Sequence, residues 1–128
     1  MENNSQPTFA NGKICYLEIP ALDIVQSSNF YQKVFAWKIR KDNDGNISFD
    51  DTVGQVSGMW VLDREPAPNP GVLISIMVYS IADTSKLIMQ NNGKIVQTHN
   101  ENAAEITARF LDPAGNLFSL YQNQQSNS

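Results

Sequence analysis

Apolar and polar positions change their period along the first half of the chain. The apolar run ICYLEIP at residues 14–20 has the near-continuous character of a buried strand and holds one carboxylate. Apolar positions then recur at helical spacing, and Asp23, with a glutamine three residues later, forms a capping box, which predicts a helix over about residues 24–35. Residues 37–51 contain two short strands around an Asp-Gly turn, and residues 56–63 form the next strand. This half is therefore predicted as strand, helix and three strands.

The same order of elements returns after a proline-rich connector, in which proline excludes helix and interior strand. A strand at residues 72–79 precedes a helix that begins at Ser80 and stops at Gly93, and three further apolar segments predict three strands. One displacement in the numbering, 57, carries Asp23 to Ser80 and also carries Ala36 to Gly93. Because helix cap and helix stop recur at one displacement, the chain is predicted to hold an internal repeat.

The two repeats are expected to be modules of one domain. Neither module has enough strands to bury its own sheet, so we expect them to form one curved sheet with the helices on its outer face. The connector is expected to act as a hinge, and the polar ends, which have little to bury, are expected to be disordered. The expected parts of the chain are, in order, a disordered tail at residues 1–12, module one at about 13–64, the connector at about 65–71, module two at about 72–122 and a disordered tail at 123–128.

Composition narrows the classes of function and the cellular compartment. With 128 residues, 41% of them hydrophobic, the chain is long enough for one compact domain. A net charge of -4 leaves no basic surface for nucleic acid, and no Lys/Arg cluster or apolar run of roughly 20 residues indicates a membrane. The single cysteine permits no intrachain disulfide, and the first ten residues lack the features of a signal peptide. We therefore expect a cytoplasmic protein that binds neither nucleic acid nor membranes.

Three segments together resemble a known superfamily. They are LEIPALDIVQSSNFYQKVFAWKI (residues 17–39), VLISIMVYSIADTSKLIMQNNGKIV (72–96) and FLDPAGNLFSLY (110–121), of which the DPxGN turn and the FYxxVF helix end are the most specific. They are similar to the glyoxalase, bleomycin-resistance and extradiol-dioxygenase proteins, also called vicinal oxygen chelate proteins. The resemblance implies an α+β fold in which two tandem βαβββ modules form a cupped mixed sheet with helices outside. It implies no single reaction, because isomerases, dioxygenases, transferases and non-catalytic drug binders share this fold.

The resemblance also implies four places where many relatives hold a divalent metal with His and Glu. Counted from the DPxGN turn, the last place falls on Ser119, and counted back from the first helix cap, the first place falls on Tyr16. Subtracting the displacement of 57 from Ser119 gives Leu62 in the first module, and adding it to Tyr16 gives Leu73 in the second. A slip in the strand register would bring Asp63 close to the place of Leu62. A serine hydroxyl is too weak a neutral donor to replace a carboxylate, and neither Tyr16 nor Leu73 is a plausible ligand at neutral pH, so at best one carboxylate remains. We therefore expect no metal site and no other cofactor; a divalent metal enters only in the enzyme alternative.

Strand alternation predicts which side chains line the cup. Leu117, Ser119 and Tyr121 share one face of the last strand, while Phe118 and Leu120 share the face under the helix. The candidate ligand-binding residues share the predicted cup face and are Tyr16, Glu18, Trp60, Leu62, Leu73, Ser75, Met77, Leu117, Ser119 and Tyr121.

Glu18 is the candidate catalytic residue, and two interpretations of it stay open. In a cavity, desolvation would disfavour its charged form, which suits a general base or a ligand anchor. Alternatively, Glu18 pairs with a cation such as Arg64 or Arg109 and fixes the cup wall. His99, the single histidine, is interpreted as a solvated loop residue, and Cys15 as a buried thiol on the helix side.

Three classes of function remain. The first is a metal-free protein that binds a small, partly apolar molecule in the cup. The second is a lyase or isomerase of the glyoxalase type, or a dioxygenase, with a non-standard site or with Glu18 as its base. The third is a non-catalytic accessory module whose cup is filled by side chains. In each case the sheet edges favour a homodimer, because a symmetric copy can cover them.

Overall fold

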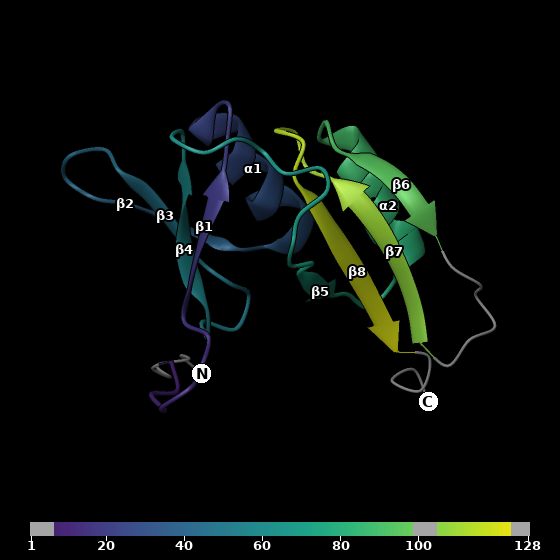
Figure 1. Cartoon of the computed structure of the whole chain (residues 1–128), viewed down its shortest axis with the longest axis horizontal. Helices are drawn as coiled ribbons and strands as arrows, with labels where there is room; N and C mark the ends of the chain where they lie inside the picture. The colour runs from purple at the N-terminus through teal and green to yellow at the C-terminus, as the bar shows by residue number, and fades with distance from the viewer. Residues whose placement is uncertain (1–6, 99–104, 124–128) are drawn as a thin grey trace. The chain divides into compact units, whose positions relative to one another are not determined.

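The computed structural model describes residues 7–98 and 105–123, and the chain divides into two compact units, Met1–Glu65 and Pro66–Ser128 (Figure 1). Each unit follows the predicted order of strand, helix and three strands. The elements of the first unit are β1 (Tyr16–Pro20), α1 (Ile24–Phe35), β2 (Lys38–Lys41), β3 (Ile47–Asp50) and β4 (Ser57–Val61). The elements of the second unit are β5 (Ser75–Met77), α2 (Ile81–Gln90), β6 (Lys94–Thr98), β7 (Glu105–Leu111) and β8 (Leu117–Asn123).

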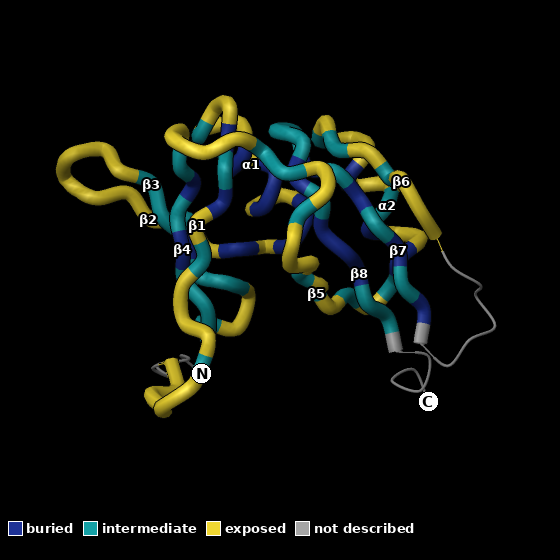
Figure 2. The backbone as a smooth tube through the Cα atoms, in the orientation of Figure 1, coloured by how far each residue is buried: buried dark blue, intermediate teal, exposed yellow. Residues whose placement is uncertain are grey.

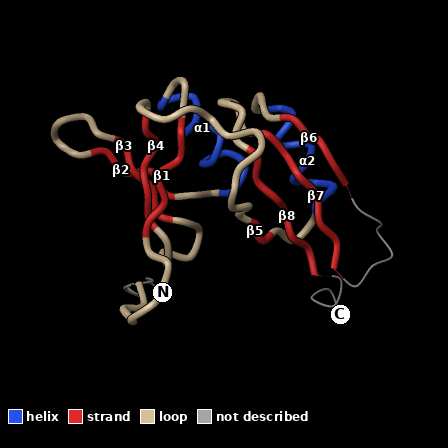
Figure 3. The backbone as a smooth tube through the Cα atoms, in the orientation of Figure 1, coloured by secondary structure: helices blue, strands red, loops and turns tan. Residues whose placement is uncertain are grey.

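The two units have the same sheet topology. The strand order is β1-β4-β3-β2 in the first and β5-β8-β7-β6 in the second, so the first and last strands of each unit are neighbours. That pair is parallel, and the other pairs are antiparallel. Helix α1 packs on β2, β3 and β4, and α2 packs on β6, β7 and β8, so each helix covers one face of its own sheet (Figure 3). The predicted βαβββ modules are confirmed.

Side chains at the helix starts and backbone geometry at their ends set the helix bounds. The carboxylate of Asp23 accepts the Gln26 N–H at 3.0 Å, and Ala36, at φ 61, donates its N–H to carbonyls of the last turn. In α2 the Ser80 hydroxyl accepts the Asp83 N–H at 3.1 Å. The left-handed position after α2 is taken by Asn92, at φ 75, one residue before the glycine that the sequence indicated as the stop. Neither helix within the described ranges is long and apolar enough to span a bilayer.

The core of the first unit is a stack of aromatic rings between α1 and the sheet. The Trp37 ring stacks on Tyr31, with centroids 4.6 Å apart, and on Phe49, at 4.5 Å. Trp60 lies 4.9 Å from Phe49 and 5.8 Å from Tyr31. All four side chains are buried, and Figure 2 colours the backbone of the elements by burial. Ring pairs of this kind contribute beyond their buried area, so this stack anchors α1 to the sheet.

The core of the second unit is mainly aliphatic. Buried Ile81 and Ile88 come from α2, and the buried side chains Ile106, Ala108 and Phe110 alternate along β7. Phe118 and Leu120 are at most 4% exposed, which confirms that they face the helix side of the sheet. Phe118 stacks on Phe110, its partner on β7, with ring centroids 5.9 Å apart.

Three hairpin turns use one Asp-x-x-Gly device. In each turn the glycine has a positive φ and donates its N–H to the aspartate carbonyl, while the aspartate side chain accepts N–H groups from the residues that follow. The three aspartate and glycine pairs are Asp42 with Gly45, Asp51 with Gly54 and Asp112 with Gly115. Hydrogen bonds, the side-chain bond from Asn46 first, hold the pKa of Asp42 below its ordinary value. The DPxGN motif is thus one of three such turns.

The connector is bonded to the second unit at Ala67. The Ala67 N–H donates to the side-chain oxygen of Asn116 at 2.9 Å, and the Leu117 N–H donates to the Ala67 carbonyl at 3.0 Å. Asn116 is buried. In the first unit, Thr8, within the segment expected to be a tail, donates its N–H to the Gln55 side chain at 3.0 Å.

Gly58 occupies the tightest position in the first sheet. It pairs with Leu17 on β1 and with Phe49 on β3. A Cβ atom at Gly58 would collide with the Leu17 carbonyl oxygen and lie 2.5–2.7 Å from two ring carbons of Phe49. The Phe49 ring therefore lies directly over the glycine, where no side chain fits.

We expect Gly58→Ala to destabilise the protein by at least about 2 kcal/mol, because the aromatic stack must shift to admit a methyl group. The control is Gly71→Ala, where an added Cβ meets nothing within 4 Å, and its effect should stay within about 0.5 kcal/mol. Urea unfolding followed by tryptophan fluorescence measures both. Equal unfolding midpoints for the two variants would contradict the tight packing at Gly58.

Candidate functional site

The site residues predicted in the second unit lie on one face of its sheet, opposite α2. In the parallel pair of β5 and β8, Ser75 is opposite Ser119, and Met77 is opposite Tyr121. Opposed residues project to the same side of a sheet, so these four side chains share a face. Leu117 shares it by alternation along β8. Leu73 precedes β5, outside the strand, and is 36% exposed. We call this surface, defined by Ser75, Met77, Leu117, Ser119 and Tyr121, the open face of the second unit.

Ser119 is less available than the sequence suggested. Its side chain is only 5% exposed, and its hydroxyl donates to the Ala108 carbonyl at 3.1 Å. The hydroxyl is therefore engaged with the main chain of β7. Met77, by contrast, is 78% exposed, and Ser75 is exposed as well. Among these five residues, the accessible groups are thus those of β5 and the flanking positions of β8.

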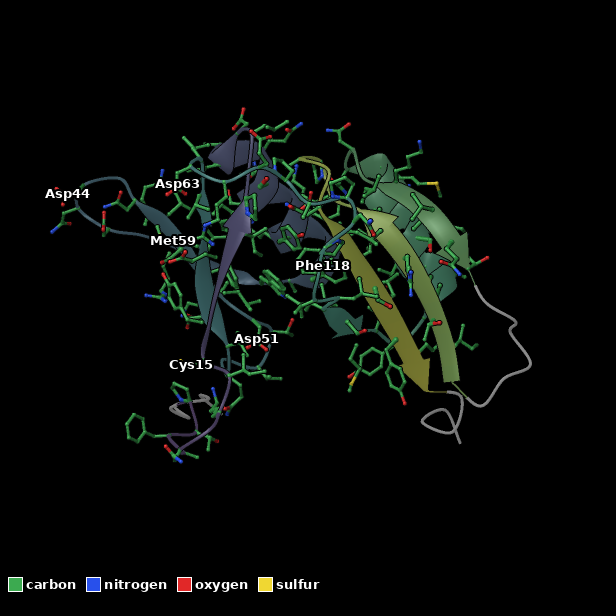
Figure 4. The ribbon with its side chains drawn as sticks, viewed as in Figure 1. Cys15, Asp44, Asp51, Met59, Asp63 and Phe118 are labelled. Atoms are coloured by element: carbon green, nitrogen blue, oxygen red, sulfur yellow. The ribbon has the colours of Figure 1, made fainter. Side chains whose placement is uncertain are left out.

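The site residues predicted in the first unit are only partly brought together. Tyr16 and Glu18 lie on β1, neither of them buried, and share the sheet face opposite α1. Glu18 is opposite Met59 on β4. Figure 4 labels Met59 on that strand. Leu62 lies beyond the end of β4 and is 65% exposed, so it occupies no strand position beside β1.

The strand register corrects the fourth place that the sequence assigned. Ser75 comes 57 residues after Glu18, as the predicted displacement requires. The strand partner of Glu18 is Met59 and that of Ser75 is Ser119, and these two partners are 60 residues apart. The second unit is therefore longer than the first between its helix and its last strand. The counterpart of Ser119 is Met59, and the assignment of Leu62 was wrong because it extended one displacement through a segment of different length.

Glu18 forms an ion pair with Arg64, one of the two cations considered as its partner. The two side chains are 40% and 54% exposed, so the pair lies at the surface of the first unit. A second pair on the same face joins Arg40 and Asp50 through two hydrogen bonds of 2.9 and 3.0 Å. Burial opposes ionisation of Asp50, but hydrogen bonds from Ser57 and Arg40 and the charges of Arg40 and Lys38 outweigh it, so its pKa lies below the ordinary value.

Two further expectations are corrected. Trp60 is 1% exposed and pairs with Ile19 on the helix side of the sheet, so it belongs to the aromatic core and does not line a ligand site. Cys15 is exposed and precedes β1, because the strand begins two residues later than the apolar run suggested (Figure 4). The interpretation of His99 concerns a position outside the described residues.

Sequence reasoning missed Arg109 as a site residue. Arg109 lies at the middle of β7, opposite Ser119, and so shares the open face. The alternation in EITARFL contained the signal, because the apolar Ile106, Ala108 and Phe110 are buried on the other side. Arg109 had been considered only as a partner for Glu18, which pairs instead with Arg64.

The donors at the paired strand positions do not suit a divalent metal. The first unit offers Glu18 and Met59, and the second offers Ser75 and Ser119. Tyr16 and Leu73, the other two places implied by the resemblance, add no carboxylate. Zinc and iron sites need several imidazole, thiolate or carboxylate donors, and these positions supply one carboxylate, which is already paired with Arg64. Within residues 7–98 and 105–123 no three His, Cys, Asp or Glu side chains are grouped so as to hold a metal ion.

Comparisons of sequence and comparisons of structure give different results for this chain. No protein-family model matches the chain, and no curated protein is significantly similar to it in sequence. Solved structures do match. A glyoxalase/bleomycin resistance protein/dioxygenase family enzyme from Burkholderia phytofirmans superposes with a TM-score of 0.67 at 16% identity, over 84% of this chain and 96% of that one.

Two resistance-related proteins match to a similar degree. The fosfomycin resistance protein FosX from Listeria monocytogenes has a TM-score of 0.67 at 13% identity, over 93% of this chain and 98% of that one. An antibiotic binding protein from a Streptomyces species has a TM-score of 0.65 at 17% identity, over 91% of this chain and 100% of that one. At these identities the likeness concerns the fold, and it confirms the resemblance seen in the sequence: the chain has the α+β fold of the glyoxalase, bleomycin-resistance and dioxygenase (vicinal oxygen chelate) superfamily.

Proposed function

We propose that this chain is a metal-independent binding protein that holds a small, partly apolar molecule against the open face of its second unit. The observation that carries the proposal is the mixture of side chains on that face. Met77 is largely exposed, Leu117 and Tyr121 are partly exposed, and the Ser75 hydroxyl lies on the same face. Apolar surface with a few polar groups is typical of sites that bind small molecules.

Donor chemistry supports the metal-independent part of the proposal. A hydroxyl and a thioether are poor ligands for zinc, nickel or iron when no thiolate or imidazole accompanies them. At the strand positions that pair in each unit, Ser119 and Met59 are such residues, and the carboxylate of Glu18 is engaged with Arg64. Metal affinity depends on several convergent donors, and one carboxylate does not supply it.

The structural neighbours support a binding role among the functions that this fold hosts. One neighbour is described as an antibiotic binding protein, and others as fosfomycin resistance proteins. A fold does not determine a reaction, so these names favour a small organic ligand and do not identify it. We further propose that the protein works as a cytoplasmic homodimer, since each four-stranded sheet has edge strands that a second copy can cover.

The metal content of the purified protein tests the metal-independent part of the proposal. After incubation with zinc, nickel or iron salts and desalting, the protein should retain less than about 0.1 ion per chain, because too few donors converge. Elemental analysis beside native mass spectrometry measures the retained metal. One tightly held ion per chain would refute the metal-independent proposal.

Another prediction concerns the open face. N-phenyl-1-naphthylamine, an uncharged aromatic probe, should bind the parent protein, and Met77→Glu should weaken that binding about tenfold or more by placing a charge in the apolar contact. Met89→Glu is the matched control, because Met89 is also exposed, at 56%, but lies on α2. Fluorescence titration measures the binding, and melting curves check that both variants fold. If both variants lose the same amount of probe affinity, the probe does not bind specifically at the open face.

A further prediction concerns the alternative in which Glu18 is a general base. In a double-mutant cycle of Glu18→Gln and Arg64→Gln, the coupling energy should be below about 1 kcal/mol, because both side chains are partly exposed. The coupling should fall further as salt is raised. A salt-independent coupling above about 2 kcal/mol would show a desolvated pair and revive the catalytic interpretation.

A further inference from the structure

One row of directly opposed residues crosses all four strands of the second sheet and is polar throughout. Gln97 on β6 is opposite Arg109 on β7, Arg109 is opposite Ser119 on β8, and Ser119 is opposite Ser75 on β5. All four side chains therefore project from the open face. We call this set the Arg109 row.

A β-bulge brings β6 into this row. Ile95 pairs with Phe110, whereas Gln97 pairs with Arg109, so Val96 is the extra residue between the two pairs. Strict alternation from Ile95 would also place Gln97 on the helix side. The bulge reverses the face of the strand at that point, so that an amide stands beside the guanidinium of Arg109 on the open face.

Apolar groups flank the Arg109 row on both sides. On one side Leu111 is opposite Leu117. On the other side Tyr121 lies between Thr107 on β7 and Met77 on β5. The open face thus presents a polar stripe between two partly apolar stripes. A ligand that fits it has a polar group at its centre and an apolar body.

The charges of the two units differ in one respect. On the first sheet both arginines are compensated, since Arg40 binds Asp50 and Arg64 binds Glu18. Among the side chains that the structure describes in the second unit, no carboxylate forms an ion pair with Arg109, although the Arg109 side chain is only partly exposed. Two other charged residues belong to this face by strand alternation: the cation Lys94, opposite Leu111, and the acid Glu105, four residues before Arg109 on β7. A partly desolvated, unpaired guanidinium is unfavourable until an anion binds it.

We propose that the molecule bound on the open face carries an oxyanion group, and that Arg109 binds this group. The inference rests on the proposed function and adds the charge class of the ligand. The planar guanidinium donates two parallel hydrogen bonds to a carboxylate, sulfonate or phosphonate. The exposed Ser75 hydroxyl and the Gln97 amide supply further donors in the same row, while the Ser119 hydroxyl is retained by the Ala108 carbonyl.

The position of the row also fixes the shape of the ligand. An oxyanion at Arg109 leaves the rest of the molecule over Leu117 and Leu111 or over Tyr121 and Met77. Either direction places an aromatic or aliphatic body on apolar side chains. The ligand class is therefore a small amphiphilic anion, with its charge near the middle of the contact.

Two fluorescent probes that differ in a sulfonate test the inference. The anion is 8-anilinonaphthalene-1-sulfonate, and the uncharged counterpart is N-phenyl-1-naphthylamine. We expect the parent protein to bind the sulfonate more tightly. Arg109→Gln should weaken sulfonate binding about tenfold or more, since a charge-assisted contact is lost, and should change binding of the uncharged probe by less than about twofold. Arg109→Lys should restore part of the sulfonate affinity, because it keeps the charge but not the paired donors.

Arg40→Gln is the matched control, because it changes the net charge equally but removes an arginine that is already paired with Asp50. It should leave the affinity for both probes unchanged. Loss of sulfonate binding in both variants would show a general charge effect and overturn the inference. So would a sulfonate affinity that does not depend on Arg109, or a loss of both probes in Arg109→Gln with a lowered melting temperature, which would show a structural role.

The same titrations separate this inference from the proposed function. If the parent protein binds the uncharged probe and Arg109→Gln leaves the sulfonate affinity unchanged, the open face is a binding site but not an anion site. If the parent protein binds neither probe, the binding function itself fails, and the anion inference fails with it.

Discussion

Parallel pairing of the first and last strands of each unit is the constraint on which the rest of the structure depends. A parallel pair needs a long crossover, and here a helix and two strands form it. The crossover places the helix on one face and leaves the other face uncovered by it. It also puts residues from the two ends of a unit side by side, such as Glu18 with Met59 and Ser75 with Ser119. The candidate site is a product of that pairing.

Local chemistry was predictable from the sequence, and the register between distant strands was not. The caps at Asp23 and Ser80 depend on residues within one helical turn, so the helices were found nearly to the residue. Placing Met59 beside Glu18, however, needs the pairing of two strands that a helix and two further strands separate along the chain, and a constant displacement between modules cannot supply it. The bulge at Val96 is likewise a property of a strand pair, and it is what brings the end of β6 into the Arg109 row.

The two units show how one topology accommodates different cores and different charge patterns. Gly58 on β4 and Phe118 on β8 occupy equivalent positions, and each is opposite a phenylalanine. In the first unit the ring covers a glycine and joins the aromatic stack, and in the second the two rings stack on each other. On the sheet faces away from the helices, Ser48 and Arg109 are the equivalent residues. The exchange of a serine for an arginine gives the second unit a cation that the first lacks at this position.

The bond between Ala67 and Asn116 gives the second unit a defined beginning. Asn116 closes the turn before β8, yet its side-chain oxygen accepts an N–H from a residue 49 positions earlier. Ala67, near the start of the second unit, is thus hydrogen-bonded to Asn116 and Leu117, at the start of its last strand. These bonds close the chain between the connector and β8 into a loop. A fragment of the second unit that began at β5 would lose this hydrogen bond and the one from the Leu117 N–H to the Ala67 carbonyl. For autonomous folding, the connector is therefore the first element of the second unit and must be included in any excised form of it.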